Sequence, residues 1–400
     1  MNCQIFSTGL SSGDFGGRGS RVMLSGISND GVDGPIPRHR SVPYGGRSTN
    51  TPLEMEPPDM NITTVGLDLA KNVFQVHGIN AAGEVVVRRR LRRSQVCAFF
   101  ADLEPCLIGM EACGTAHFWA RELAALSHDV RIMPPSYVKA YIRRGKNDAV
   151  DAEAICEAVM RPNMRFVPIK TEEQQAALML HKARELLIRQ QTMLVNALRA
   201  HMAELGMITP QGRGRVEDII AVIEDDEDES IPGLAKSALK PLVTQLRAAE
   251  ETTASLDAEI MSWHKSNEAS KRLATIPGVG VLTASAIAAT VPDPSFFCSG
   301  REFSAWLGLT PRQNSSGGKD RLGRISKQGN RYIRRLLVIG ATSVLRHARA
   351  KSAPGADWVN GLLERRPPRL VTVAMANKTA RIAWALLTKG ETYRAPIAVV

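Results

Sequence analysis

The pattern of apolar and polar positions predicts a chain with an α/β part followed by two helical parts. Between residues 62 and 135, short apolar or alternating runs predict strands, in the order ITTVGLDLA, NVFQVHGIN, EVVVRRRL, CLIGME and DVRIMP. Two stretches with helical spacing, SQVCAFFADL and AHFWARELAALS, lie before and after CLIGME. Three opening strands followed by strand and helix units predict a mixed α/β sheet flanked by helices.

Two long helical segments follow the α/β part. In the second, apolar positions step by three and four, as in a heptad seam: Leu239, Leu242, Leu246, Ala249, Thr253, Leu256, Ile260 and Trp263. An acidic run, EDDEDES, separates the two segments and is typical of a solvated loop. We expect an antiparallel coiled-coil stalk whose seam is either closed within the chain or used for dimerisation.

These patterns divide the chain into consecutive regions. The first region, rich in Gly, Ser, Pro and Arg and without apolar periodicity, is expected to be a disordered upstream extension with no part in the fold. The expected regions are 1–59 (extension), 60–168 (catalytic α/β domain), 169–268 (stalk), 269–394 (mainly α C-terminal domain) and 395–400 (tail).

The C-terminal domain opens with RLATIPGVGVLTASAIAA, which resembles a helix-hairpin-helix. In such a turn, Gly278 and Gly280 would let backbone N–H groups approach a DNA phosphate. Short Gly-Pro turns between helices are common, so an ordinary turn explains the sequence equally well.

Composition and charge narrow the class of protein. The hydrophobic fraction of 44% and the charged fraction of 23% fit a soluble globular protein, and no window of eighteen apolar residues predicts a membrane span. A net charge of +11 and a pI near 9.6 favour a polyanionic partner such as nucleic acid over a merely basic surface. The six cysteines have no paired metal-ligand spacing and indicate reduced thiols in a cytosolic protein.

Four acidic residues of the first domain are candidates for metal binding. Asp68 lies in the first strand, Glu111 follows a later strand, and Asp148 and Asp151 lie three positions apart on the closing helix. An RNase-H-like sheet would bring such carboxylates together, and their repulsion would be relieved by divalent metal, most simply two Mg²⁺ ions suited to phosphodiester cleavage. The alternative for the pair on the helix is that aspartates near a helix start complement its dipole.

Two groups of cations are candidates for nucleic-acid binding. Arg143, Arg144 and Lys146 precede the Asp148–Asp151 helix and would lead the backbone of the substrate into the site. A second group recurs over a Gly/Ser loop and the helix after it, where phosphate contacts are favoured over a solvated face. This group consists of Lys319, Arg324, Lys327, Arg331, Arg334 and Arg335.

Several long motifs together resemble the DEDD transposases of bacterial insertion sequences, in the insertion-sequence one-ten family and its eleven-eleven branch. The motifs are VGLDLAKNVFQVHG, CLIGMEACGTAHFWAREL, RRGKNDAVDAEAICEAV, ATIPGVGVLTASAI and LGLTPRQNSSGGKDRLGRISKQGNRYIRRLL, and the resemblance extends from about Met60 to about Arg394. It implies an RNase-H-like (RuvC-like) α/β N-terminal domain whose D-E-D-D carboxylates are the four acids above. It also implies a C-terminal serine that attacks DNA, within NSSGGK, where Ser316 is favoured and Ser315 is the alternative.

The resemblance further implies partners and an assembly. Members of this family are similar in using a structured non-coding guide RNA that pairs with donor and target DNA, and they act as oligomers whose acids and serine meet in one composite site. We therefore expect a Mg²⁺-dependent, RNA-guided DNA transposase that acts on element ends and target DNA as a dimer or tetramer in the bacterial cytoplasm. Two alternatives stay open: a RuvC-like junction endonuclease that uses water, and a non-catalytic nucleic-acid-binding scaffold.

Overall fold

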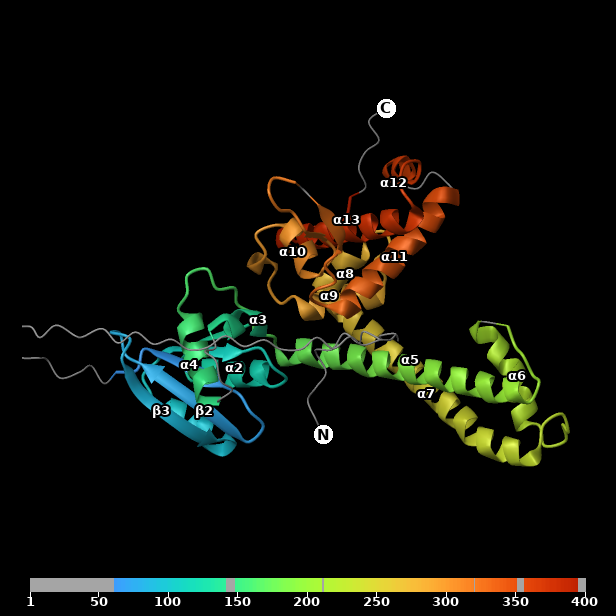
Figure 1. Ribbon diagram of the computed structural model, residues 1–400, viewed down its shortest axis with the longest axis horizontal. Coiled ribbons are helices and arrows are strands. Elements are labelled where there is room, and N and C mark those ends of the chain that lie inside the picture. The colour runs from blue at the N-terminus through green and yellow to red at the C-terminus, as the bar shows by residue number, and fades with distance from the viewer. Residues whose placement is uncertain (1–60, 142–147, 211, 320, 351–355, 395–400) are drawn as a thin grey trace, which may run out of the picture.

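The computed structural model describes residues 61–141, 148–210, 212–319, 321–350 and 356–394. Predictions about residues 1–59, residues 395–400 and the three cations Arg143, Arg144 and Lys146 lie outside the described residues. Figure 1 shows a sheet domain at one end, two long helices that project from it, and a helical C-terminal domain beside the near half of these helices.

The first domain is a mixed five-stranded sheet with the strand order β3-β2-β1-β4-β5. β1 pairs antiparallel with β2 and parallel with β4, β2 pairs antiparallel with β3, and β4 pairs parallel with β5. The five predicted strands and the two predicted helices are confirmed. The elements are β1 (Thr64–Asp68), β2 (Val73–Ile79), β3 (Val85–Arg92), α1 (Val96–Ala101), β4 (Leu107–Glu111), α2 (Ala116–Ala125), β5 (Asp129–Met133), α3 (Pro135–Val138) and α4 (Asp148–Val159).

The sheet has a core on each side. Side chains alternate along a strand, so Val65 and Leu67 of β1 point to the side of α1 and α2, where Phe100 and Trp119 are buried with them. Gly66, between these two residues, points to the opposite side, which α4 covers. The buried central strand β1 therefore presents every second residue to α4.

The two long helices, α5 (Glu172–Glu204) and α7 (Gly233–Ser266), pack against each other and run in opposite directions (Figure 1). Leu239, Leu246 and Ile260 of the predicted seam are at most 3% exposed, so the seam is closed within the chain. The buried Gln191 side chain of α5 donates hydrogen bonds to the Ala249 carbonyl at 2.8 Å and to Thr253 Oγ1 at 2.9 Å. These bonds fix how α5 and α7 are aligned.

A further helix, α6 (Val216–Glu224), lies at the far end of the two long helices and was not predicted (Figure 1). Val216, Ile219, Ile220 and Ile223 are buried there among residues of α5 and α7. The acidic run follows α6, and Lys236 donates to the carbonyls of Asp225 and Asp228 within it. The far end of the arm thus has its own small apolar core.

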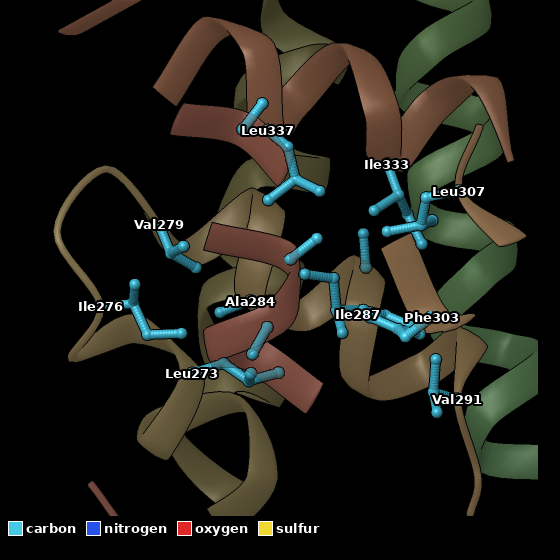
Figure 2. Close-up of a cluster of buried hydrophobic side chains, with 14 of the residues drawn as sticks. Leu273, Ile276, Val279, Ala284, Ile287, Val291, Phe303, Leu307, Ile333 and Leu337 are labelled. Carbon is cyan, nitrogen blue, oxygen red and sulfur yellow. The ribbon is translucent and has the colours of Figure 1, made fainter. Parts of the chain in front are cut away.

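The C-terminal domain is mostly helical. Its main core gathers Leu273, Ile276, Val279, Ala284, Ile287, Val291, Phe303, Leu307, Ile333 and Leu337, which Figure 2 shows pointing toward one another. Its elements are α8 (Glu268–Ala274), α9 (Val281–Thr290), α10 (Gly300–Trp306), β6 (Pro311–Gln313), β7 (Leu322–Ile325), α11 (Arg331–Ala350), α12 (Ala356–Leu363) and α13 (Pro368–Lys389).

A buried polar network joins α5 to this domain. His181 of α5 is 2% exposed, and burial lowers the pKa of its imidazole to about 4, so the ring is neutral. Ser285 donates its proton to the Val281 carbonyl at 2.6 Å and therefore accepts from His181 Nε2 at 3.1 Å. The Tyr332 hydroxyl donates to His181 Nδ1 at 3.1 Å. The network anchors the near half of α5 to α9 and α11.

The turn between α8 and α9 has a packing role of its own. Gly278 has a φ of +82°, and a Cβ there would lie 2.8 Å from the Gly340 carbonyl oxygen of α11. Gly278 is therefore required by contact with the same chain, whereas a Cβ at Gly280 would meet no atom within 4 Å. The predicted approach of a DNA phosphate stays a prediction, and Gly280 is the more open position for it.

Within the described ranges, no helix is both long and apolar enough to cross a membrane.

Candidate active site

Two of the predicted acids lie side by side at the ends of β1 and β4. The parallel pairing sets Leu67 opposite Met110, so the next residue of each strand, Asp68 and Glu111, also lie next to each other. Both alternate with residues of the α1 and α2 core, so both belong to the side of the sheet that α4 covers. Strand register alone therefore brings these two carboxylates together.

Helix α4 approaches the sheet unusually closely. A Cβ at Gly66 would lie 2.1 Å from the Ala152 carbonyl oxygen and 2.5 Å from the Cys156 nitrogen, and a Cβ at Gly109 would lie 2.7 Å from Val159 Cβ. Glycine is needed at both strand positions for the helix to lie where it does. Because Asp151 directly precedes Ala152, this contact carries the third acid to the ends of the two strands.

The electrostatics agree with this placement. Burial raises the pKa of the Glu111 carboxyl above its ordinary value, and the negative charges of Asp68 and Asp151 raise it further. All three side chains are partly buried. Asp148 is the first residue of α4, one turn before Asp151, and its side chain lies outside the described residues. The structure thus gathers three of the four predicted acids.

The chemistry of this cluster suits a hard divalent cation. Carboxylate oxygens are the ligands that Mg²⁺ prefers, and a cation would remove the repulsion that raises the pKa of Glu111. Among the described side chains, no three His, Cys, Asp or Glu groups already lie close enough together to hold a metal ion. Metal binding would therefore need the Asp148 side chain or a rotation of the three acids.

The two candidate serines lie in a β-hairpin, where the sequence predicted only a flexible loop. β6 and β7 pair antiparallel, and Gly317 and Gly318 turn the chain between them with φ values of 57° and 75°. The Ser315 hydroxyl accepts a hydrogen bond from the Arg321 N–H at 3.2 Å, which holds the hairpin closed. In the described part of the chain, the hydroxyl of the exposed Ser316 has no hydrogen-bond partner. Ser316 is thus the more available of the two hydroxyls.

The hairpin and the acids belong to different parts of the molecule. The acids lie in the sheet domain and the hairpin in the C-terminal domain, which Figure 1 shows as separate bodies. An ion pair between Arg165 and Glu302 connects the two bodies. Among the residues described, no hydrogen bond or ion pair joins the hairpin to Glu111 or Asp151. One chain by itself therefore does not assemble acids and serine into one described site.

The predicted cations of the C-terminal domain fall into two groups. Arg334 donates to the carbonyls of Leu307 at 2.8 Å and Gln328 at 2.7 Å, and Arg335 pairs with Glu185 at 3.2 Å. These two arginines are used inside the fold. Four others are exposed and have no carboxylate partner among the described residues: Lys319, Arg324, Lys327 and Arg331. They stay candidates for phosphate contacts.

The structure also shows basic and aromatic residues that the sequence analysis did not assign to a site. Arg301, Trp358 and Arg369 come together with Arg324 around one groove of the C-terminal domain. These residues are far apart in the sequence, so no regular spacing indicates that they lie together in the fold.

Comparison with known proteins agrees with the motifs. Residues 65–207 match a transposase family model of the DEDD type, and residues 270–354 match a model described as the transposase IS116/IS110/IS902 family. A probable family 20 transposase of Pseudomonas aeruginosa is 46% identical over 336 residues, which cover 84% of this chain and 99% of the relative.

Two relatives belong to named insertion sequences. The transposase for insertion sequence element IS1111A of Coxiella burnetii is 40% identical over 334 residues, covering 84% of this chain and 92% of the relative. The transposase for insertion sequence element IS1328 of Yersinia enterocolitica is 38% identical over 333 residues, covering 83% of this chain and 99% of the relative. The chain therefore belongs to the IS110 family of insertion-sequence transposases, in agreement with the eleven-eleven branch that its motifs resemble.

Proposed function

We propose that this transposase cuts and rejoins DNA with a metal-binding acid cluster made of Asp68, Glu111, Asp148 and Asp151. The observation that supports the proposal is the convergence of three of these acids beneath α4, where burial and the charges of Asp68 and Asp151 raise the pKa of Glu111. The mixed sheet, with the acids at the ends of adjacent parallel strands, fits an RNase-H-like domain. Like charges held together in a partly buried cluster are costly for a fold, so they point to a cation as their partner.

The four acids would hold Mg²⁺, most simply two ions. Bound there, the ions would supply Lewis-acid stabilisation of the charge that develops on the phosphoryl oxygens. The residues of the chain set the geometry: the parallel register aligns Asp68 with Glu111, and the glycine contacts seat Asp151 above them. A cation bound there would offset the burial and the two neighbouring charges that raise the pKa of the Glu111 carboxyl.

Ser316 is the proposed nucleophile. Its hydroxyl oxygen would bond to a DNA phosphorus while the phosphodiester bond to the deoxyribose oxygen breaks. The serine proton passes to a nearby proton-accepting group, and the released sugar oxygen takes up a proton. The resulting phosphoserine link conserves the bond energy needed to rejoin strands. Ser315 is less suited, because its oxygen already accepts the Arg321 N–H inside the hairpin.

The separation of hairpin and acids within one chain supports a composite site. We infer that the acids of one subunit act with the serine of another in a dimer or tetramer. A structured guide RNA that pairs with DNA is proposed from the family resemblance, and the net charge of +11 favours polyanionic partners. The proposed compartment is the bacterial cytoplasm.

A second candidate is a Mg²⁺-dependent junction endonuclease that uses water in place of serine. It is favoured by one observation: the acids gather in a single chain without the hairpin. Trapping distinguishes the two functions. DNA carrying the element ends is incubated with wild-type protein and Mg²⁺, quenched in denaturant, and examined for a covalent protein–DNA adduct.

The transposase predicts an adduct that Ser316→Ala abolishes and that the adjacent Ser315→Ala retains. Cleavage that survives in both variants without any adduct would establish the water-dependent endonuclease. A non-catalytic scaffold predicts instead that Asp68→Ala and Asp151→Asn leave recombination in cells at the wild-type level.

A further inference from the structure

A large groove opens in the C-terminal domain between the β6–β7 hairpin, α10, α12 and α13. We call it the α13 groove. It has a volume of about 1660 Å³, and its floor is aliphatic, formed in part by Leu309, Ile325, Val373 and Ile382. Figure 1 shows α13 running along the top of this domain with α12 at its edge. An apolar hollow of this size on a strongly basic protein calls for an occupant with both apolar and anionic parts.

The exposed lining residues, which we call the rim of the α13 groove, include many cations. No Asp or Glu is among the described residues that line it, and most of its cations are exposed. The lining cations are Arg301, Arg324, Lys327, Arg369, Lys378 and Arg381. None of them has an ion pair with a carboxylate in the described part of the chain. Six uncompensated positive charges around one hollow are complementary to a polyanion.

Two tryptophans line the groove, and Trp384 is partly buried with its indole N–H donating to the Pro294 carbonyl at 3.1 Å. Trp358 of α12 is 38% exposed, although Lys378 of α13 lies over its ring at 4.1 Å from the centroid. Burial and the charge of Arg381 lower the pKa of Lys378, so these cations repel each other without a counter-charge. An exposed tryptophan beside cations is the arrangement on which unpaired bases stack while their phosphates contact the rim.

We propose that the α13 groove binds an unpaired DNA strand, with bases on its aliphatic floor beside Trp358 and phosphates on its cationic rim. The proposal rests on the proposed transposase function, because it supplies the strand next to the phosphate that Ser316 attacks. Pro311, Arg324 and Ile325 of the hairpin form one wall of the groove. A smaller hollow continues from Arg301 and Arg381 to Gln313 and Leu322, along the hairpin toward its tip.

The geometry favours an unpaired strand over a duplex, and the proposed attack of Ser316 on a DNA phosphate assigns that strand to DNA. A duplex presents phosphates at its surface and cannot place bases on a recessed apolar floor. The Asn377 amide at the floor already donates to Ser304 Oγ at 2.9 Å and to the Leu309 carbonyl at 3.3 Å. Both N–H groups of this amide are therefore used within the chain, and only its oxygen stays available to accept a hydrogen bond from a strand.

The test measures binding of a fluorescent twelve-nucleotide oligothymidylate to the full chain by anisotropy over a range of salt concentrations. The variant Arg301→Gln/Arg369→Gln removes two rim charges. The matched control, Arg189→Gln/Lys265→Gln, removes two exposed charges from α5 and α7. At about −0.7 per phosphate contact, the slope of log affinity against log salt should weaken by about 1.4 in the groove variant, with about tenfold weaker binding near 0.15 M salt. The control should keep both values.

Trp358→Leu separates stacking from charge. It should weaken binding of the oligothymidylate at least about fivefold without changing the salt slope. Binding of an abasic strand of the same length should be the same for Trp358→Leu and wild type. Because no cleavage is measured, the assay does not depend on catalysis by the acids or by Ser316. A failure of the acid and serine mechanism would therefore leave this result intact.

Several outcomes would overturn the proposal. Equal binding by the groove variant and the control would show that the groove does not hold the strand, while the adduct experiment on Ser316 would still decide the catalytic proposal. Tighter groove-dependent binding of oligouridylate would assign the groove to RNA, and groove-dependent binding of a duplex alone would assign it to paired DNA. A change of mass in light scattering without a change in DNA affinity would make the groove a contact between copies of the chain.

Discussion

Replacing Gly66 by alanine should separate α4 from the sheet and disperse the acid cluster. A Cβ at this position would lie 2.1 Å from the Ala152 carbonyl oxygen, whereas ordinary contact begins near 3.4 Å, so the helix must retreat by about 1.3 Å (3.4 − 2.1). The neighbouring Cys156 nitrogen, at 2.5 Å, is also backbone and cannot rotate away. Overpacking of this kind costs about 1–3 kcal/mol of stability.

The loss of activity should exceed the loss of stability. Asp151 is adjacent to Ala152 and moves with the helix, and a displacement of about 1 Å at a catalytic group lowers rates by about a hundredfold. Urea unfolding and hydrogen exchange of the α4 amides would measure the first effect, and Mg²⁺-dependent DNA cleavage the second. Gly233→Ala is the control, because a Cβ there would meet nothing within 4 Å.

If Gly66→Ala unfolds and cleaves DNA as wild type does, the position of α4 does not depend on glycine at this strand residue. Reduced stability with normal cleavage would instead show that the acids still act when α4 is displaced. The contact between Gly66 and Ala152 would then contribute to stability and not to the position of the acids.

Three further perturbations test other parts of the structure. Without Mg²⁺ at pH 7, Glu111→Gln should melt at a higher temperature than wild type. A carboxyl whose pKa is raised in the folded state stabilises the fold only while it is protonated, and this contribution is lost as pH rises through the folded pKa. The advantage should vanish below about pH 4, where both side chains are neutral, and an advantage that persists there in thermal melts would contradict the assignment. Gln191→Ala should lower the free energy of unfolding by about 1–3 kcal/mol in urea titrations, because it removes both buried hydrogen bonds. Gln190→Ala, which changes the exposed neighbouring residue, should leave the free energy of unfolding nearly unchanged. Leu246→Asp should unfold the long helices, since Leu246 is 1% exposed within the chain; a folded monomer in circular dichroism and light scattering would show that the seam holds subunits together instead.

The sequence predicted the sheet domain well because its strands have apolar runs or clear alternation. The β6–β7 hairpin escaped prediction because its strands are short and almost wholly exposed, so they have no apolar alternation. Helix α6 was not among the predicted elements, although Val216, Ile219, Ile220 and Ile223 have helical spacing.

The site was predicted only in part, for a physical reason. Residue type and position identified Asp68, Glu111 and Asp151 as acids at strand ends and on a helix, but their closeness depends on Gly66, whose contact with Ala152 joins distant segments. Likewise, Arg334 and its basic neighbours look alike as charges, and only the fold shows that Arg334 binds two carbonyls of its own chain. Pairings between remote segments leave no periodicity in a single sequence.

The hydrogen bonds of Gln191 restrict how the projecting arm can change in evolution. Its amide meets the Ala249 carbonyl and Thr253 in only one alignment of α5 and α7, and a slip by one turn would bury an unsatisfied amide. An insertion or deletion in one helix, between these hydrogen bonds and the far end of the arm, must therefore be matched by an equal change in the other helix. In related transposases whose α5 and α7 differ in length from those here, both helices should be longer or shorter by the same number of whole turns. The length of the arm should therefore change in steps of one helical turn.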